Sequence, residues 1–430
     1  MSQFAIPAIT KPFNAEICLP GSKSIALRQL AMAALHSGQT TLSGIPKCDD
    51  ADAMLDCIAR LGAQVEVTEH NQQEQVTVLG PINLTEDVTL DARMSGASTR
   101  LLIGLAALRT GTTTIDGHPS LRVRTNQPLF ETLSRYGCDV QVKNSQDYPG
   151  LPVTIRGPLQ TDQPIRIDGS LSSQYITALM TIAPLCPNGL TIEIEGALVS
   201  RPYLNITTNE MRKRGAEVNW ISDQTLNIPA SAYSGGAITV EGDATGATYF
   251  AALATLHRST ITLSNLGNSS AQGDYAFMQV MASLGAEVDS QAHQTIITGP
   301  AVLSALANID MTAMPDAALT LIGMGMLLPQ PVTITGLSTL HHKECDRLEC
   351  SVTELQNMGV QVASTWDSIT IHPMADLSQL SEYTMTTYHD HRMAMAFSML
   401  GSKSGQLRVD DERVVDKTFP TYWEEYLRLV

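Results

Sequence analysis

Basic side chains recur next to short turns of small polar residues in this 430-residue chain. The first such turn has Lys23 inside it, and the last ends at Arg392. Turns of this kind typically begin helices, whose free N–H groups and partial positive charge attract phosphates and carboxylates. Six of them follow one another at a spacing of roughly seventy residues, namely Gly21–Ser24, Ser95–Arg100, Ser170–Gln174, Gly242–Thr245, Pro315–Asp316 and Asp390–Arg392. The pattern predicts a repeat protein that binds an anionic ligand.

The first turn has the residue types of an anion site. Ser24 and Arg28 lie four residues apart, so on a helix they share one face, with Lys23 at its start. The spacing of a Walker A loop is absent, which disfavours nucleotide binding. A helix that is capped by serine and carries surface charges explains the same residues equally well.

Two further pairs of basic residues have a similar spacing. If residues 120–124 are extended, Arg122 and Arg124 point to the same side and need an anion between them. A solvated edge strand would also explain this pair. Lys343 and Arg347 are four residues apart and would share a face of a helix. Acidic residues lie between these two, so a salt-bridged helix surface is the favoured interpretation.

Asp316 directly follows Pro315, which places it in the first turn of a helix. There it is either a helix cap or, within reach of a substrate hydroxyl, a general base. The histidines that could suggest a metal site are His341, His342, His389 and His391. They lack a third ligand at helical spacing, so we expect no metal site.

The net charge of the chain is −16, with 27 basic residues against 43 acidic ones. This excess of negative charge argues against binding to nucleic acid or to an anionic membrane. The N-terminal residues lack the pattern of a signal peptide, and the apolar stretch 317–328 is too short to span a bilayer. We therefore expect a cytoplasmic protein whose seven cysteines are reduced.

A second repeated element joins a helix to a strand through glycine. Gly62, Gly137, Gly215, Gly285 and Gly359 recur every 70 to 78 residues, each followed by a short strand pattern. Glycine after a helix favours a left-handed cap, and alternating apolar residues favour a strand. Each repeat therefore contains two helices and several strands, which predicts an α/β fold built of repeats.

Only five of the six turns are followed by a glycine joint and its strand pattern, so the last repeat lacks these strands of its own. The segments 4–9 and 15–19 have strand patterns and could return to complete it. We therefore expect the chain to cross between two lobes twice, near Pro20 and near Gly242. One lobe comprises residues 21–241, and the other comprises residues 1–20 with 242–430. A cleft between hinged lobes is then the expected ligand site.

Taken together, these motifs resemble the enolpyruvyl transferases from about Leu19 to Trp423. The segments that carry the resemblance are Leu19–Ser24, Asp168–Gln174, Val199–Tyr203, Lys343–Arg347, Asp390–Met395 and Lys417–Pro420. The resemblance implies a two-lobed fold with three βαββαβ-like units in each lobe. It also implies transfer of the enolpyruvyl group of phosphoenolpyruvate to the 5-hydroxyl of shikimate 3-phosphate, with release of phosphate and without a cofactor. These small anions are the expected partners, and the expected state is a monomer.

The resemblance also assigns a role to individual residues. Shikimate 3-phosphate would be bound by Lys23, Ser24, Arg28, Ser172, Ser173, Gln174, Ser200, Asp316, Thr339 and Lys343. Phosphoenolpyruvate would be bound by Lys23, Gly96, Arg124, Gln174, Arg347, Arg392 and Lys417. Asp316 would take the proton of the attacking hydroxyl, and Glu344 with Lys23 would deliver protons to the methylene carbon and the leaving phosphate. The lobe 21–241 would bind mainly shikimate 3-phosphate, while the other lobe would complete the phosphoenolpyruvate site.

Two places depart from the family pattern. Met94 and Ala97 stand in a loop that usually reads Asn, Ala, Gly, Thr before its arginine, and Thr339 stands where Asn is common. These departures bear on affinity and on sensitivity to glyphosate, a mimic of phosphoenolpyruvate. They keep open a divergent enolpyruvyl transferase that uses another phosphorylated cyclic alcohol.

Two more functions fit the residues less well. The related transferase that acts on UDP-N-acetylglucosamine carries a loop cysteine, whereas no cysteine lies between Cys57 and Cys138 here. A non-catalytic protein that only binds anions would have no reason to place Asp316 and Glu344 beside its cations.

Overall fold

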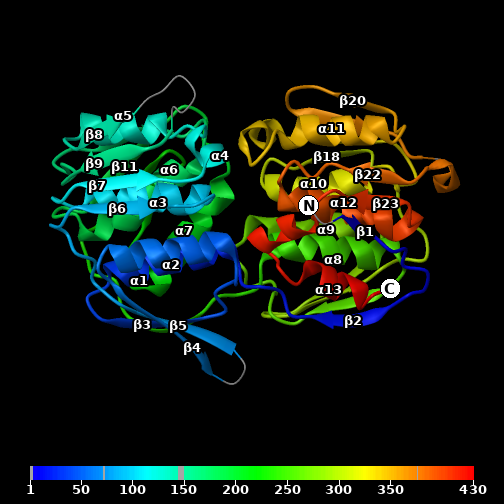
Figure 1. Cartoon of the computed structure of the whole chain (residues 1–430), viewed down its shortest axis with the longest axis horizontal. Coiled ribbons are helices and arrows are strands. Elements are labelled where there is room, and N and C mark those ends of the chain that lie inside the picture. Colours follow the sequence, from blue (N-terminus) through cyan, green and yellow to red (C-terminus); the bar gives the residue numbers. More distant parts are fainter. Residues whose placement is uncertain (1–2, 71–72, 144–149, 375) are drawn as a thin grey trace. The chain divides into compact units, whose positions relative to one another are not determined.

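The computed structural model describes residues 3–70, 73–143, 150–374 and 376–430. The chain divides into two compact units (Figure 1). One unit is Gly21–Glu241, and the other combines the N-terminal residues up to Pro20 with Gly242–Val430.

Within its described residues, the unit Gly21–Glu241 holds three four-stranded sheets, in the orders β14-β3-β5-β4, β6-β7-β9-β8 and β10-β11-β13-β12. In each sheet one parallel pair is extended by two antiparallel strands, as β6 and β7 are by β9 and β8. The strands are β3 (Gln39–Ser43), β4 (Gln64–His70), β5 (Gln73–Leu79), β6 (Val88–Asp91), β7 (Thr113–Asp116), β8 (Asp139–Val142), β9 (Val153–Arg156), β10 (Ile165–Asp168), β11 (Leu190–Glu195), β12 (Asn219–Ser222), β13 (Thr225–Ile228) and β14 (Gly236–Thr239).

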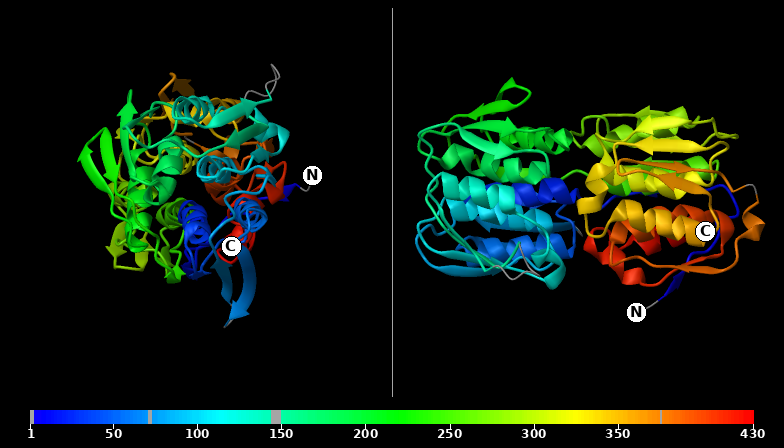
Figure 2. Two further views of the ribbon diagram at one scale, coloured as in Figure 1. Left: turned by 90° about the vertical axis from the view of Figure 1, so that its left-hand side faces the viewer. Right: turned by 90° about the horizontal axis from the view of Figure 1, so that it is seen from above.

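Three helices of this unit are buried, namely α1 (Lys23–Leu35), α3 (Gly96–Ala107) and α6 (Ser173–Ile182). They lie side by side, with contacts within each pair (Figure 2). A Cβ on Gly104 would lie 2.7 Å from the carbonyl oxygen of Ala178, so glycine lets α3 and α6 pack closely. The remaining helices are α2 (Asp49–Arg60), α4 (Pro119–Arg122), α5 (Gln127–Arg135), η1 (Ala183–Leu185) and α7 (Arg201–Lys213).

The other unit repeats this plan. Its sheets, again within the described residues, have the orders β16-β17-β15-β2, β18-β19-β21-β20 and β1-β23-β22. The strands are β1 (Phe4–Ala5), β2 (Asn14–Ile17), β15 (Thr260–Leu263), β16 (Glu287–Ser290), β17 (Thr295–Thr298), β18 (Asn308–Asp310), β19 (Val332–Thr335), β20 (Val362–Ser364), β21 (Ser368–Ile371), β22 (Tyr383–Met385) and β23 (Leu407–Val409).

Three buried helices again form the centre of this unit, namely α8 (Ala244–Leu256), α10 (Pro315–Gly325) and α12 (His391–Ser404). Gly323 on α10 lies against the carbonyl of Ala396 on α12, where a side chain would not fit. The other helices are η2 (Gly273–Ala276), α9 (Phe277–Ser283), η3 (Ser338–His342), α11 (Arg347–Asn357), η4 (Leu377–Gln379), η5 (Glu412–Lys417) and α13 (Tyr422–Leu427). The six small sheets around buried helices have the two-lobed α/β repeat architecture that the sequence predicts.

The two repeated sequence elements have the predicted structures. The six polar turns begin the six buried helices α1, α3, α6, α8, α10 and α12. The five joint glycines all have positive φ, between 79° and 104°. A strand follows each glycine, namely β4, β8, β12, β16 and β20. Only glycine adopts this backbone conformation at little cost, which explains its recurrence at this point of the repeat.

The N-terminal segments complete two different sheets, so the expectation that both complete the last repeat is wrong. Phe4–Ala5 pairs with β23 in the last sheet, as expected. Asn14–Ile17 instead pairs in parallel with β15, two repeats earlier in the chain. In most repeats, the strand that precedes the buried helix joins the sheet of the same repeat. The strand that precedes α8 is β14, and it pairs instead with β3 in the unit Gly21–Glu241. Asn14–Ile17 therefore takes its place beside β15.

Candidate active site

In the unit Gly21–Glu241, the buried Arg28 is held by three helices. Its Nη1 donates to the carbonyl oxygen of Ser24 at 2.7 Å, so the two residues share a face of α1 as predicted. Its Nε donates to Oγ1 of Thr207 on α7 at 2.8 Å, and Nη2 lies 3.4 Å from Oγ1 of Thr177 on α6. Burial lowers the pKa of Arg28 to about 10, so the guanidinium stays charged at neutral pH. These acceptors are uncharged, which leaves the positive charge available to an anion.

The start of α6 brings three predicted ligands together. Oγ of Ser172 caps the helix by accepting from the N–H of Gln174 at 3.2 Å. Ser173 is buried in the first turn. Helix starts with free N–H groups of this kind are suited to phosphate oxygens.

Ser200 lies at the start of α7 in a strained backbone conformation. Its φ is 54°, in the left-handed region that residues other than glycine seldom adopt. The preceding residue contacts the segment that leads from β10 to α6, because the N–H of Val199 donates to the carbonyl of Gly169 at 3.2 Å. The structure therefore brings Ser200 near the start of α6, and Nη2 of Arg28 reaches the Tyr203 carbonyl of α7 at 3.3 Å.

Two guanidinium groups meet at the first residue of α3. A Cβ on Gly96 would lie 2.5 Å from Nη1 of Arg100 and 2.6 Å from Nη1 of Arg124. Nη1 of Arg100 also donates to the Gly96 carbonyl at 2.9 Å, which fixes its position. Among the described residues, Arg124 has no carboxylate within ion-pair distance. This helix start therefore combines a residue without a side chain with two cations, a combination that suits a carboxylate or phosphate.

Lys23 lies in the first turn of α1 and pairs with an acidic residue that the sequence analysis missed. Its Nζ lies 2.9 Å from Oδ2 of Asp50, whose side chain is buried in the first turn of α2. The only signal in the sequence is the run of acidic residues at 49, 50 and 52, which also fits a helix start.

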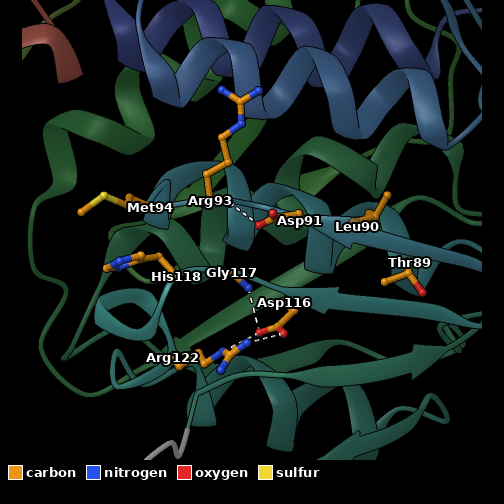
Figure 3. A pocket seen from close by; sticks show the side chains of 9 residues that line it. All are labelled: Thr89, Leu90, Asp91, Arg93, Met94, Asp116, Gly117, His118 and Arg122. Carbon is orange, nitrogen blue, oxygen red and sulfur yellow. Dashed lines mark hydrogen bonds and ion pairs between the residues drawn. The ribbon is translucent and has the colours of Figure 1, made fainter.

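A pocket of about 490 Å³ lies at the carboxyl ends of β6 and β7 (Figure 3). It is lined by Thr89, Leu90, Asp91, Arg93, Met94, Asp116, Gly117, His118 and Arg122. Arg122 donates to both carboxylate oxygens of Asp116, at 2.8 and 2.7 Å, and Arg93 pairs with Asp49 at 2.9 Å. Both guanidinium groups are thus balanced within the unit, which disfavours this pocket as an anion site.

The expectation of an extended chain at Arg122 and Arg124 is wrong. Residues Pro119–Arg122 form the short helix α4. Proline at the first helical position favours this start, and Nδ1 of His118 accepts from the Ser120 N–H at 3.3 Å. Arg122 therefore binds Asp116, whereas the guanidinium group of Arg124 lies beside Gly96.

In the other unit, Asp316 at the start of α10 contacts three cations. Its Oδ1 lies 2.9 Å from Nζ of Lys343 and 3.0 Å from Nη1 of Arg347, and its Oδ2 lies 3.4 Å from Nη2 of Arg392. Burial would raise the pKa of the Asp316 carboxyl, but the three cations outweigh it and hold this pKa well below its usual value. The predicted helix start is confirmed, and the carboxylate is ionised.

Arg347 is almost fully buried and is shared by three carboxylates. Nε and Nη2 donate to the two oxygens of Asp390, at 2.7 and 3.2 Å. Nη1 donates to Asp316, and Nη2 donates to Oε2 of Glu344 at 2.9 Å. Oε1 of Glu344 in turn lies 3.2 Å from Nζ of Lys417. We name this network the Asp316 cluster; its members are Asp316, Lys343, Glu344, Arg347, Asp390, Arg392 and Lys417.

Lys343 and Arg347 do not share a helix, contrary to the favoured interpretation. Lys343 follows η3 in an extended conformation, and α11 begins only at Arg347. Both still reach Asp316, from opposite ends of the intervening segment. Asp346 caps α11 by accepting from the Glu349 N–H at 3.0 Å, which stops the helix from extending back to Lys343.

Thr339 lies on η3, four residues before Lys343. Its Oγ1 is buried and has no hydrogen-bond partner among the described residues. A buried hydroxyl of this kind is typical of a position that a ligand or a water completes.

Two other features are absent from the described part of the chain. No group of three or more His, Cys, Asp or Glu residues there is arranged to hold a metal ion. None of the described helices combines the length and apolar character needed to cross a membrane.

The model of one protein family, EPSP synthase (3-phosphoshikimate 1-carboxyvinyltransferase), matches residues 7–426. The chain belongs to the EPSP synthase family. Curated relatives with the name 3-phosphoshikimate 1-carboxyvinyltransferase match it over the full length of both chains. The protein of Aliivibrio salmonicida is 34% identical over 433 residues, and that of Nostoc sp. is 32% identical over 431 residues.

Solved structures show the same fold. The EPSP synthase of Acinetobacter baumannii has a TM-score of 0.79 at 23% identity, covering 100% of this chain and 98% of that chain. The enolpyruvyl transferase NikO of Streptomyces tendae has a TM-score of 0.76 at 15% identity, covering 99% of this chain and 96% of that chain. EPSP synthases thus share their fold with a more distant enolpyruvyl transferase.

Within this member of the EPSP synthase family, Asp390 is a member of the Asp316 cluster to which the sequence analysis assigned no role. It begins one of the six helix-start turns, and its Oδ1 caps α12 by accepting from the Arg392 N–H at 2.9 Å. Its second interaction, with Arg347, joins residues 43 positions apart. That partner could not be read from a local motif.

Proposed function

We propose that the chain transfers the enolpyruvyl group of phosphoenolpyruvate to the 5-hydroxyl of shikimate 3-phosphate and releases phosphate. The full-length family match supports this reaction. The observation that carries the proposal at the site is Asp316, a carboxylate ringed by Lys343, Arg347 and Arg392. The reaction needs a base for the hydroxyl and cations for two anionic substrates, and this arrangement supplies both.

The unit Gly21–Glu241 is proposed to bind mainly shikimate 3-phosphate. The cation of Arg28 and the helix starts at Ser172 and Ser200 support this role, since both attract phosphate oxygens. The proposed ligands are Lys23, Ser24, Arg28, Ser172, Ser173, Gln174 and Ser200, together with Asp316, Thr339 and Lys343 of the other unit.

Phosphoenolpyruvate is proposed to use the two convergent guanidinium groups at Gly96 and cations of the Asp316 cluster. A bare backbone at Gly96 allows the anion to approach the N–H groups of α3. The proposed ligands are Lys23, Gly96, Arg124, Gln174, Arg347, Arg392 and Lys417.

Substrate binding is proposed to make Asp316 basic. Without substrate, three cations stabilise its ionised form and make it a weak base. When substrate anions attract Lys343 and Arg392, this stabilisation decreases and the pKa of Asp316 rises. The carboxylate then accepts the proton of the 5-hydroxyl as its oxygen bonds to C2 of phosphoenolpyruvate.

Glu344 and Lys23 are the proposed acids. Glu344 takes up a proton when substrate anions engage Arg347 and Lys417, and delivers it to the methylene carbon of phosphoenolpyruvate as the new bond forms. Lys23 gives a proton to the leaving phosphate and regains the 5-hydroxyl proton that Asp316 holds. Return of one methyl proton to Glu344 restores the double bond as phosphate departs. Arg347 and Lys417 hold the Glu344 carboxylate from two sides, which sets its position. Each step uses a side chain of this chain and no cofactor, and we expect a monomer that works in the cytoplasm.

The proposal is tested by phosphate release after mixing the protein with both substrates. Release that requires shikimate 3-phosphate and phosphoenolpyruvate together supports the proposed reaction. A folded protein that binds phosphoenolpyruvate but releases phosphate only with another phosphorylated cyclic alcohol would identify a divergent transferase. That second candidate function is favoured by Met94, Ala97 and Thr339, and by the existence of NikO on the same fold.

A further inference from the structure

His341 lies where three segments of one unit meet. It belongs to η3, which contacts α11, and α11 contacts β20 (Figure 1). Its Nδ1 lies 2.7 Å from Oδ2 of Asp346, the residue that caps α11. Its Nε2 lies 2.8 Å from the carbonyl oxygen of Trp366, in the turn between β20 and β21. The imidazole also stacks on the Trp366 indole, with ring centroids 3.8 Å apart and planes at 14°.

Both partners of the His341 ring can only accept hydrogen bonds. A carboxylate oxygen and a carbonyl oxygen carry no proton, so each ring nitrogen must donate one. A neutral imidazole has one N–H and would place a lone pair against one of these oxygens. With Asp346 ionised, the geometry therefore favours the imidazolium form.

The charged groups around the ring favour the same form. Asp346 and Glu349 lie on the side of α11, and Asp367 lies in the β20–β21 turn, where it accepts from the Ser338 N–H at 2.8 Å. Burial alone would lower the pKa of His341, but the hydrogen bonds to Asp346 and Trp366 outweigh it and raise this pKa above 6.5.

The bridge between His341 and Asp346 spans the segment that carries two functional groups. Lys343 and Glu344 lie inside this span, and Arg347 directly follows it. Lys343 must reach Asp316, and Glu344 must reach both Arg347 and Lys417. These residues have no helix or strand of their own, since η3 ends before them and α11 begins after them.

We propose that His341, as an imidazolium, is a positioning residue that closes the segment 341–346 and thereby fixes Lys343 and Glu344 for catalysis. The inference rests on the roles of Lys343 and Glu344 in the proposed function. It gives catalysis a pH dependence that comes from His341, a residue outside the proposed substrate ligands.

The direction of the pH effect follows from the raised pKa of His341. The folded state holds the proton more tightly than the unfolded state, so the bridge is complete at pH values below about 6.5. It is lost as the pH rises through the folded-state pKa, because the neutral ring releases one of its two acceptors. Catalysis should therefore decline on the alkaline side.

The first experiment measures the protonation of His341 in the wild-type protein without substrates. Long-range ¹H–¹⁵N NMR spectra, assigned with a His341→Gln variant, should show both ring nitrogens protonated at pH 6.5. One unprotonated ring nitrogen at pH 6.5 or below would overturn the proposal. This readout does not depend on enzymatic activity.

The second experiment compares the pH profiles of kcat/KM for three variants between pH 6 and 9. His341→Gln should lower kcat/KM roughly tenfold at pH 6.5, the effect of one lost charged hydrogen bond, and flatten the alkaline limb. His341→Arg keeps a cation with donors for both acceptors, so it should retain activity and move the alkaline limb to higher pH. The exposed neighbour provides the control: His342→Gln should leave the profile unchanged.

The two experiments separate failure of the inference from failure of the proposed function. An alkaline limb that is unchanged in His341→Arg would contradict the positioning role, whatever the NMR result. A wild-type protein that releases no phosphate from these substrates would contradict the proposed function. In that case hydrogen exchange at Lys343 and Glu344 still tests the bridge, because exchange should accelerate in His341→Gln but not in His342→Gln.

Discussion

At the scale of single residues, Asp316 is held in a state that substrate must change. The same cations that stabilise its charge are the proposed ligands of substrate anions, so carboxylate and substrate compete for them. This competition links binding to basicity: the more completely the anions engage Lys343 and Arg392, the better Asp316 accepts a proton.

Asp316→Ala should abolish most turnover and leave shikimate 3-phosphate binding largely intact. Loss of a general base typically costs about 10²–10⁴ in rate. Binding should be largely kept, because the lost contact between Asp316 and the substrate is offset when Lys343 loses a competing carboxylate. Calorimetric titration with shikimate 3-phosphate and the phosphate-release assay check both parts, with Asp310→Asn as a control at an exposed strand end. Normal turnover by Asp316→Ala would show that another group is the base.

Asp274 gives a second prediction at this scale, on stability. Burial and the nearby Asp316 raise the pKa of Asp274 to about 7, and Thr245 donates to its Oδ2. The folded state therefore keeps a proton that the unfolded state releases near pH 4, and stability should fall as the pH rises from about 4 to 7. Asp274→Asn has no such proton to lose, so at pH 8 it should be more stable than wild type by roughly 1–4 kcal/mol.

Thermal unfolding of wild type and Asp274→Asn at pH 5 and pH 8 measures this difference. The stabilisation should be larger at pH 8. Asp289→Asn, at an exposed position on β16, is the matched control and should show little effect at either pH. Equal effects of Asp274→Asn at both pH values would mean that Asp274 ionises as in the unfolded chain.

At the scale of elements, α3 shows how a helix start depends on the residue that opens it. Gly96 leaves room for Arg100 and Arg124 beside the first N–H groups. The same turn is tied to α2, because Oγ of Ser98 donates to the Asp50 carbonyl at 3.2 Å. Asp50, which also pairs with Lys23, therefore links the start of α3 to the start of α1.

Gly96→Ala should weaken the binding of phosphoenolpyruvate more than the binding of shikimate 3-phosphate. The new methyl group would displace the tips of two flexible guanidinium groups, so the fold should persist. Loss of one charged hydrogen bond corresponds to a rise in KM for phosphoenolpyruvate of about tenfold to a hundredfold. Steady-state kinetics with each substrate varied in turn measures the two KM values separately. An equal rise in both KM values would contradict the assignment of Gly96.

At the scale of the whole molecule, the first residues of the chain belong to the same unit as the last. The N–H of Ile6 donates to the Leu407 carbonyl at 2.9 Å, and the N–H of Ile9 donates to the Ser402 carbonyl at 2.8 Å. The side chain of Ile6 is buried against Gly401 on α12, where an added Cβ would lie 2.6 Å from it. The N-terminal segment is thus part of the core that supports α12 and Arg392.

Ile6→Ala should destabilise the unit that contains Gly242–Val430 and leave the other unit unchanged. Truncating a buried isoleucine typically costs about 2–5 kcal/mol. Hydrogen exchange followed by mass spectrometry should show faster exchange in α12 and β23 but not in α1. The reciprocal control is Ile25→Ala, which should affect α1. Faster exchange throughout both units would show that they unfold together.

The sequence alone was sufficient for features that depend on local chemistry. The six turns and the five joint glycines were predictable because a helix start needs polar caps and a left-handed cap needs glycine, whatever the rest of the chain does. Motif order then identified the family and its fold. Asp316 could be placed at a helix start from Pro315 alone.

Only the tertiary structure decided which partners these residues have. Arg347 meets Asp316 and Asp390 across 31 and 43 positions of chain, and Asn14–Ile17 pairs with a strand that starts at Thr260. In the sequence His341 has the residue type of a metal ligand, whereas in the structure its ring contacts the Asp346 carboxylate and the Trp366 carbonyl. Such pairings depend on packing between distant segments. The charge and hydrogen-bonding capacity of a side chain are set by its residue type, but the fold decides which partner the side chain meets.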